Sequence, residues 1–293
     1  MHYCLANQPE YWPADYYVEV GPPQFELKAI TIYNGIVFVM NRHELFLIQG
    51  SGADSFFPFP VSHSRGALSQ ETVLSVKGKG IFRVHTDGIW LYTETEDIRI
   101  TDGNFSPIFN GESKGTIPAI NQDYIENSWL KYHKNKLYFG YPDSDATHPN
   151  NILVMRLDTK QVSHYDYSKT FMDITIDKTN DRVLTVDNEG FVWEIENRKY
   201  PDDAGTDVSW EIESKAFSDA LRKYFPRSAK YDVEFDSTAS ATGEILLDDV
   251  VVQSHTLASR QTKKRLIDGN NGDRLGIRIS GAGVASFRQV EVE

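Results

Sequence analysis

The sequence predicts an all-β fold, a β-propeller of about four to five blades followed by a small β-sandwich-like C-terminal domain. Three observations predict this fold class: short runs of alternating apolar and polar residues, Asn, Asp and Gly residues between the runs, and a regular spacing of the turns. Comparable turns fall at Gly35, Gly88, Asn135 and Gly190, at intervals of 53, 47 and 55 residues. A period of roughly 40–50 residues made only of strands is typical of a propeller blade.

Four pairs of strand-like runs are expected to form hairpins. The paired runs are residues 35–41 with 44–50, 81–87 with 88–94, 136–142 with 151–158, and 182–188 with 191–197. Asp87-Gly88 and Asn188-Glu189-Gly190 supply residues that tolerate the positive φ of tight turns. A further strand precedes each hairpin, and these are expected to be outer strands of the blades: residues 25–34, 73–79, 128–134 and 171–178. A long antiparallel sandwich or two stacked meanders would show similar turns without the regular period.

A domain boundary is expected near Tyr200–Asp207, where KYPDDAGTD concentrates Pro, Gly and Asp. The predicted domains are residues 1–206, the propeller, and residues 207–293, the C-terminal β domain. The first carries 18 basic and 28 acidic residues, a net charge of −10, and the second carries 12 and 14, a net charge of −2. Strand patterns fill most of the second domain, and helical spacing allows one short helix over residues 217–224. Residues 2–7 are expected to close the ring by pairing with late strands near residues 191–214.

Composition excludes several classes of protein. The 293 residues carry a net charge of −12, which argues against a general binder of nucleic acid or anionic membranes, because both require a basic face. Cys4 is the single cysteine, so no intrachain disulfide can form. No run of about 18 apolar residues is present, so no membrane insertion is expected. The first residues lack a basic and an apolar segment, and no secretory signal is predicted.

The sequence predicts no catalytic, cofactor-binding or metal-ligating residue, and no cofactor. His63 and the other histidines show no metal-ligand spacing, and Cys4 has no protease signature around it. The glycines of GSGAD (50–54) and GAGVAS (281–286) lack the remaining positions of a phosphate loop and are predicted to be turns. DSDATHPN (143–150) and DGNNGD (268–273) carry oxygen ligands suited to calcium, but neither matches the order of an EF-hand loop.

Carboxylates and aromatic side chains leave two alternatives open. A propeller could place a glycosidase pair of carboxylates in its channel, but the sequence offers too many to choose from; Asp87, Asp187 and Glu194 are the ones to test. The segment 185–193 resembles the Asp-box of sialidases with one residue too many, and an Asp-box is structural. Seven aromatic residues would suit sugar stacking or a protein interface, although blade-to-blade cores are the expected place for them: Tyr11, Trp12, Tyr16, Tyr17, Phe56, Phe57 and Phe59.

Several segments resemble the tail nozzle or tail hub β-propeller proteins of short-tailed bacteriophages. They are NQPEYWPADYYVEVG (7–21), GNFSPIFNG (103–111), SWEIESKAFSDALRKYFPRSAKYDVEFDS (209–237) and the closing strands from ILLDDVVVQSH onward. Nozzle proteins are usually longer, and a segment like 7–21 comes later in them, which indicates a short or prophage-encoded relative. The resemblance implies a virion location after assembly in the host cytoplasm.

The resulting expectation is a structural component of a phage or prophage tail that is not an enzyme. Its expected partners are other tail proteins and further copies of itself in a homo-oligomeric ring. If such a ring forms a channel, its acidic wall would let DNA pass without specific binding. The alternative is a carbohydrate-binding or carbohydrate-active β-propeller.

Overall fold

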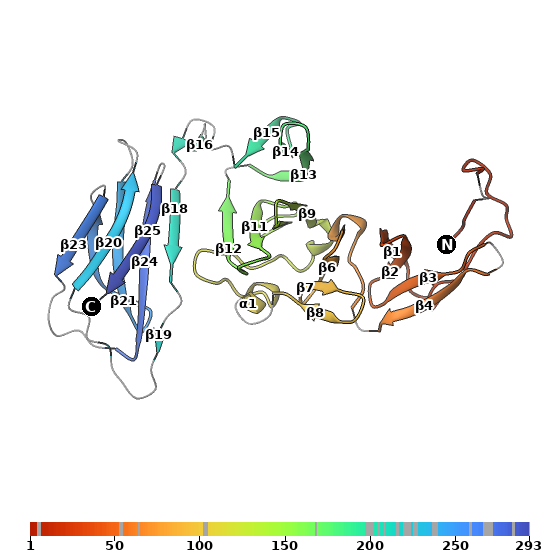
Figure 1. The fold of residues 1–293 in the computed structure, drawn as a ribbon, viewed down its shortest axis with the longest axis horizontal. Coiled ribbons are helices and arrows are strands. Elements are labelled where there is room, and N and C mark those ends of the chain that lie inside the picture. Colours follow the sequence, from red (N-terminus) through yellow and green to blue (C-terminus); the bar gives the residue numbers. More distant parts are fainter. Residues whose placement is uncertain are drawn as a thin grey trace. The chain divides into compact units, whose positions relative to one another are not determined.

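The computed structural model describes two compact units, Met1–Ile195 and Glu196–Glu293 (Figure 1). Up to residue 196 it describes all positions except 5, 6, 53, 54, 64, 102–104 and 168. In the second unit it further describes residues 202, 203, 206, 207, 209–214, 217, 218, 224, 228–235, 240–257, 260–265, 272–282 and 285–292. Along the chain, the boundary between the two units falls between residues 195 and 196, whereas the sequence predicts it between residues 206 and 207.

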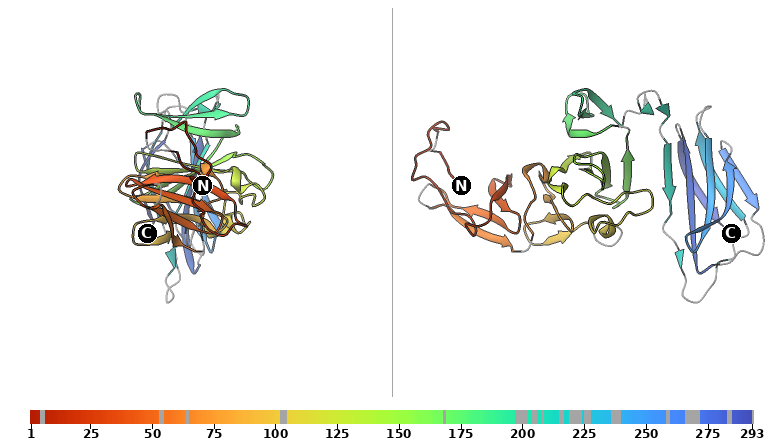
Figure 2. Two further views of the ribbon diagram at one scale, coloured as in Figure 1. Left: turned by 90° about the vertical axis from the view of Figure 1, so that its right-hand side faces the viewer. Right: turned by 180° about the vertical axis from the view of Figure 1, so that it is seen from behind.

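The first unit is built of four antiparallel sheets that follow one another along the chain (Figures 1 and 2). The first sheet contains β1 (Leu27–Tyr33), β2 (Ile36–Asn41), β3 (Leu45–Gln49) and β4 (Phe57–Ser62). The second contains β5 (Val73–Val76), β6 (Gly80–His85), β7 (Gly88–Tyr92) and β8 (Asp97–Arg99). The third contains β9 (Trp129–His133), β10 (Lys136–Tyr141), β11 (Asn151–Arg156) and β12 (Val162–Asp166). The fourth contains β13 (Phe171–Asp177), β14 (Arg182–Asp187) and β15 (Val192–Ile195).

Local sequence explains why these segments form hairpins. Between β1 and β2, Asn34 and Gly35 both adopt positive φ, 50° and 79°, which is the geometry of a two-residue hairpin turn that matches the twist of the strands. The single short α-helix of the described residues, α1 (Ser106–Phe109), has Pro107 in its first turn, where a missing N–H costs nothing. Two one-turn 3₁₀ helices, η2 (Gln70–Thr72) and η3 (Ile125–Asn127), lead into the second and third sheets.

The first strand of each sheet lies beside the first strand of the next. β1 contacts β5, β5 contacts β9, and β9 contacts β13. The sequence assigns these four strands to the outside of the blades, and this assignment is wrong. A period-2 pattern specifies which side chains share a face but does not specify which edge of the sheet turns inward.

Apolar clusters fill the spaces between consecutive sheets. Phe38, Met40 and Leu45 of the first sheet pack with Val73 and Ile81 of the second. A second cluster, which includes α1, joins the second and third sheets, and a third joins the third and fourth. All-β architecture is thereby confirmed, with sheets stacked face to face as in a propeller. The described residues do not show a closed ring.

The amino terminus pairs with its own neighbourhood and not with the late strands. Met1 and Val18 exchange two main-chain hydrogen bonds of 2.9 Å, and Tyr3 donates to the Tyr16 carbonyl at 3.0 Å. Val18 and Met1 then pack on Val39 and Phe46 of the first sheet. The expected pairing of residues 2–7 with residues 191–214 is therefore wrong for the described part of this segment.

The described residues of the second unit form three antiparallel sheets. The largest has the order β18 (Ser209–Glu213), β24 (Arg274–Ala282), β21 (Ser240–Leu247), β22 (Val250–Leu257), and β19 (Phe217–Ser218) also pairs with β24. The second has the order β23 (Arg260–Arg265), β20 (Ser228–Phe235), β25 (Ala285–Val292). The third consists of β16 (Asp202–Asp203) and β17 (Thr206–Asp207). Tyr231 of β20 and Ile245 of β21 share one buried core. Residues 217 and 218 of the expected helix are strand, and residues 219–223 lie outside the described part.

Candidate functional site

One end of each sheet in the first unit carries an Asn or Asp side chain at the end of the second strand or within two residues after it. These residues are Asn41, Asp87, Asp143 and Asp187. Asn41 accepts hydrogen bonds of 2.7 Å from the main-chain N–H groups of His43 and Glu44, and Asp143 accepts one of 3.1 Å from that of Asp145. Because strands alternate in direction, the first strand of each sheet begins at this same end. The chemistry-bearing side chains of the unit gather there.

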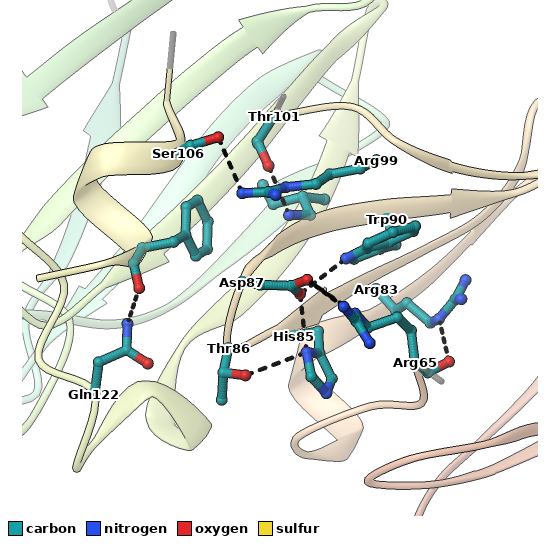
Figure 3. A network of polar contacts seen from close by, with 12 residues as sticks. Arg65, Arg83, His85, Thr86, Asp87, Trp90, Arg99, Thr101, Ser106 and Gln122 are labelled. Atoms are coloured by element: carbon teal, nitrogen blue, oxygen red, sulfur yellow. Dashed lines mark hydrogen bonds and ion pairs between the residues drawn. The ribbon is translucent and has the colours of Figure 1, made fainter. Parts of the chain in front are cut away.

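Asp87 is the centre of the most connected of these turns (Figure 3). Its Oδ1 accepts hydrogen bonds from His85 Nδ1 at 2.9 Å and from Trp90 Nε1 at 3.1 Å. Its Oδ2 accepts from Arg65 Nε at 2.9 Å and Nη2 at 2.8 Å. The Arg65 guanidinium also lies 5.2 Å from the centre of the Trp90 ring, a cation–π distance. With four donors on one carboxylate, this cluster holds the β6–β7 turn and leaves Asp87 no oxygen free for chemistry.

The pKa of Asp87 reflects these bonds. Burial by itself raises this pKa, but the hydrogen bonds from Trp90, Arg65 and His85 outweigh burial and lower it below the ordinary value. Burial lowers the pKa of His85, and its bond to Asp87 opposes this effect only in part. The geometry therefore describes an ionised carboxylate in a structural role.

Replacing Asp87 by asparagine should lower the free energy of unfolding by about 2 kcal/mol at pH 7, since hydrogen bonds to a charged group are lost. A lowered pKa in the folded state stabilises the fold above the unfolded pKa of about 3.9, and this contribution disappears as pH falls. The difference in the free energy of unfolding between wild type and variant should thus stay constant above about pH 5 and become smaller below about pH 4. Urea unfolding at pH 7, 5, 4 and 3 measures it; a difference unchanged at pH 3 would contradict the assignment.

Asp187 holds the corresponding turn of the fourth sheet. Its Oδ1 accepts from the main-chain N–H groups of Glu189 and Phe191, at 3.0 and 2.8 Å, and its Oδ2 accepts from Trp193 Nε1 at 2.8 Å. Against the effect of burial, these bonds lower the pKa of Asp187. Glu194 lies on β15 and pairs with Arg182 at 3.3 Å. The three carboxylates named for testing, Asp87, Asp187 and Glu194, are therefore held in separate structural contacts and do not form one site.

Two other carboxylates do meet, at the inner strands. Lys131 of β9 places its Nζ 3.1 Å from Glu71 Oε2 and 3.1 Å from Asp173 Oδ1. Glu71 comes from η2, before the second sheet, and Asp173 from β13 of the fourth sheet. The carboxylate side chains are 60% and 47% exposed, whereas the lysine side chain is 25% exposed. Strands of two sheets and the 3₁₀ helix η2 thus contribute to one solvent-accessible acidic pair around a cation.

The neighbouring contacts extend this arrangement to the first sheet. The Gln70 amide, next to Glu71, accepts from the main-chain N–H of Ile30 at 3.0 Å and donates to its carbonyl at 3.1 Å. Burial alone would lower the pKa of Lys131, but the ion pairs with Asp173 and Glu71 raise it above the ordinary value for lysine. Lys131 therefore stays protonated at neutral pH. Sequence reasoning missed this site; the only available signal was a charged residue on each of two predicted strands, Lys131 and Asp173.

The other candidates from the sequence have local roles. His63 is exposed and lies 3.7 Å from Glu44, and Cys4 is a half-buried free thiol. Gly50–Gly52, the described part of the first glycine segment, lie in the connection between β3 and β4, and Ser55 Oγ accepts from Ser51 N and Gly52 N, each at 3.0 Å. In segment 143–150, which carries oxygen ligands suited to calcium, Asp143 Oδ2 accepts from the amides of Asn150 and Asn151, at 2.8 and 3.2 Å.

Positions 268–271 of the second calcium segment and 283–284 of the second glycine segment lie outside the described residues. Among the residues that are described, no group of three or more His, Cys, Asp or Glu side chains is arranged to hold a metal ion. Within the same residues, no helix combines the length and apolar character needed to cross a membrane.

Five of the seven aromatic residues are exposed and do not fill the cores between sheets. The exposed fractions are 56% for both Tyr11 and Trp12, 51% for Tyr17, 61% for Phe57 and 48% for Phe59. Tyr16 and Phe56 are half-buried. The expectation that this set packs between blades is wrong for these five, because the amino-terminal segment lies on the outer face of the first sheet and β4 lies at the edge of that sheet.

Comparison with known proteins gives matches among solved structures alone. No protein-family model matches the chain, and no curated protein does. A crystal structure of exo-β-1,3-galactanase from Phanerochaete chrysosporium with galactose is 9% identical, with 97% of this chain and 86% of that chain covered and a TM-score of 0.32. A variant of that enzyme with β-1,3-galactotriose is 8% identical, with 97% and 87% covered and a TM-score of 0.33.

These matches correct two expectations from the sequence. A non-catalytic phage tail component, and a protein that is not an enzyme, are contradicted because the matched structures are those of a galactanase and not of a tail protein. At such TM-scores and identities, the likeness assigns no activity and no site residue to this chain. The resemblance to tail nozzle proteins, with the tail partners, ring and virion location it implies, stays a prediction from the sequence.

Proposed function

We propose that this is a carbohydrate-active protein whose first unit is a β-propeller of four to five blades, followed by a small β-sandwich-like domain. The observation that carries the proposal is the pair of exposed carboxylates, Glu71 of η2 and Asp173 of β13, that converge on Lys131 of β9. Glycoside cleavage requires two carboxyl groups on either side of the scissile bond. The successive contacts of β1 with β5, of β5 with β9 and of β9 with β13 support the propeller arrangement that brings these residues together.

The distance between the Glu71 and Asp173 carboxylates bears on which mechanism of glycoside cleavage they could support. Glu71 Oε2 and Asp173 Oδ1 both lie 3.1 Å from one nitrogen, so they cannot be farther apart than twice that distance. The limit applies to these two oxygens in the ion-paired state, and it accommodates the roughly 5–5.5 Å between the carboxyl groups of retaining glycosidases. The proposal therefore assigns direct attack to one of the two carboxylates.

The two carboxylates have different tasks in this proposal. Asp173 on β13 keeps its ion pair with Lys131 and attacks the anomeric carbon. Glu71 is the more exposed, and a bound glycan displaces it from Lys131. In its protonated form, Glu71 is the general acid that donates a proton to the leaving glycosidic oxygen. Water then releases the sugar from Asp173, with Glu71 as the base.

The proposal is tested with a panel of aryl glycosides and unlabelled oligosaccharides, by following release of the aglycone or of reducing sugar. Wild type should turn over at least one substrate. Glu71→Gln and Asp173→Asn should each lower kcat/KM by about 10²-fold or more, as expected for loss of an acid–base or nucleophilic group. Glu126→Gln is the matched control, because Glu126 occupies in η3 the middle position that Glu71 occupies in η2. Turnover that survives both site substitutions, or that never occurs, would overturn the assignment.

A further inference from the structure

The amino-terminal segment forms a two-stranded ribbon, defined here as Met1–Tyr3 with Tyr16–Val18 and the described residues 7–15 of the loop between them. Main-chain hydrogen bonds join Met1 to Val18 and Tyr3 to Tyr16, with His2 and Tyr17 opposite each other. Because side chains alternate across a strand, the ribbon has two different faces. The inner face packs on the first sheet through Met1 and Val18, and the Tyr3 ring lies edge-on to Phe56, with centroids 5.1 Å apart.

The outer face of the ribbon and its loop are aromatic. The rings of His2 and Tyr17 lie 5.8 Å apart on the outer face. In the loop, Tyr11 and Trp12 are each 56% exposed. Two turns fix the loop, through hydrogen bonds from Tyr11 N to the Gln8 carbonyl at 3.1 Å and from Tyr16 N to the Pro13 carbonyl at 3.0 Å. The rings are thus presented by an ordered backbone, which lowers the entropy lost when a partner binds.

The charged side chains of residues 1–19 are all carboxylates. They are Glu10, Asp15 and Glu19, and all three are exposed. No Lys or Arg occurs before Lys28, and the terminal ammonium donates to the Val18 carbonyl at 2.9 Å. Among the described residues, these three carboxylates make none of the ion pairs found elsewhere in the unit. Exposed aromatic rings in a segment whose charged side chains are all carboxylates favour cations, which bind Trp and Tyr faces through their quadrupole.

We infer that the outer face of this ribbon binds a lysine- or arginine-bearing segment of a partner protein. Arg and Lys side chains would lie on Trp12, Tyr11 and Tyr17, and the carboxylates Glu10 and Asp15 would pair with them at the rim. Tyr and Trp are the residues that most often anchor protein interfaces, and complementary charge selects the partner. This surface is separate from Glu71, Lys131 and Asp173, so its occupancy does not depend on the proposed glycan chemistry.

The inference is tested by fluorescence anisotropy with labelled hexa-arginine and hexa-lysine peptides as probes, at 20 mM and 300 mM salt. Wild type should bind both peptides, more tightly at low salt. Trp12→Ala should weaken binding about tenfold through loss of cation–π contact. The double variant Glu10→Gln/Asp15→Asn should weaken binding and reduce its salt dependence. These positions are exposed, and unchanged melting temperatures would show that each variant folds.

Two control variants separate a specific surface from general attraction to an acidic protein. Phe57→Ala removes an exposed aromatic ring outside the ribbon, and Glu126→Gln removes an exposed carboxylate outside it; neither should change the affinity. Equal affinity of wild type and Trp12→Ala, equal weakening by the controls, or no binding by wild type would each overturn the inference. Neutral oligosaccharides that compete with the peptides at this face would also overturn it and would indicate a glycan surface instead.

Discussion

Replacing Asp97 by asparagine is expected to lower the free energy of unfolding of the first unit by about 3–5 kcal/mol, because it leaves a buried guanidinium without its counter-charge. Arg83 on β6 is 0% exposed, and its Nη2 lies 2.5 Å from Asp97 Oδ2 on β8. Arg83 Nε also donates to the Arg65 carbonyl at 3.2 Å. Burial lowers the pKa of Arg83, whereas Asp97 raises it and keeps the guanidinium charged.

Thermal unfolding followed by circular dichroism measures this effect, with a fall in Tm on the order of 10 °C expected for a unit of this size. The matched control is Asp158→Asn. Asp158 pairs with Arg156 at 2.9 Å, but both side chains are about half exposed, so Tm should not change. Replacing both partners, as Arg83→Met with Asp97→Leu, should restore much of the loss, since no unpaired charge remains. Equal stability of Asp97→Asn and wild type would show that the pair does not hold the second sheet.

Replacing Gly140 by alanine is expected to destabilise the first unit by about 2–4 kcal/mol through overpacking and a lost hydrogen bond. Gly140 of β10 lies opposite Trp129 of β9, and a Cβ at this position would fall 2.1 Å from the indole ring. Trp129 is 1% exposed, so the ring has no room to retreat. Its Nε1 donates to the Phe171 carbonyl at 3.2 Å and so ties the third sheet to the start of the fourth.

Urea unfolding with tryptophan fluorescence measures the loss and also reports whether the indole leaves its site. Gly52→Ala is the control, because a Cβ there would meet no atom within 4 Å and the residue does not have positive φ. That variant should unfold at the same urea concentration as wild type. If Gly140→Ala is as stable as wild type, the packing of Trp129 between the third and fourth sheets is not as tight as its burial indicates.

The sequence by itself determined the local elements. Alternation and turn residues placed the first three strands of each of the four sheets within a few residues, since strand pairing across a short turn depends on neighbours such as Asn34 and Gly35. They did not place β4, β8 and β12, the fourth strands of the first three sheets. The spacing of these turns indicated a repeated β unit. The same local rules predicted most strands of the second unit, including β24 and β25.

Only the tertiary structure decided which edges of the sheets turn inward and which side chains meet there. Glu71 and Lys131 are 60 positions apart in the chain, and they meet because β5 stacks beside β9. The partner of Asp173 is likewise decided by contact between β9 and β13. Hydrophobic periodicity assigns a side chain to a face, but it contains no information about the neighbouring sheet. For that reason the sequence could not select a pair among its many carboxylates, whereas stacking of the sheets brings Glu71 and Asp173 to one lysine.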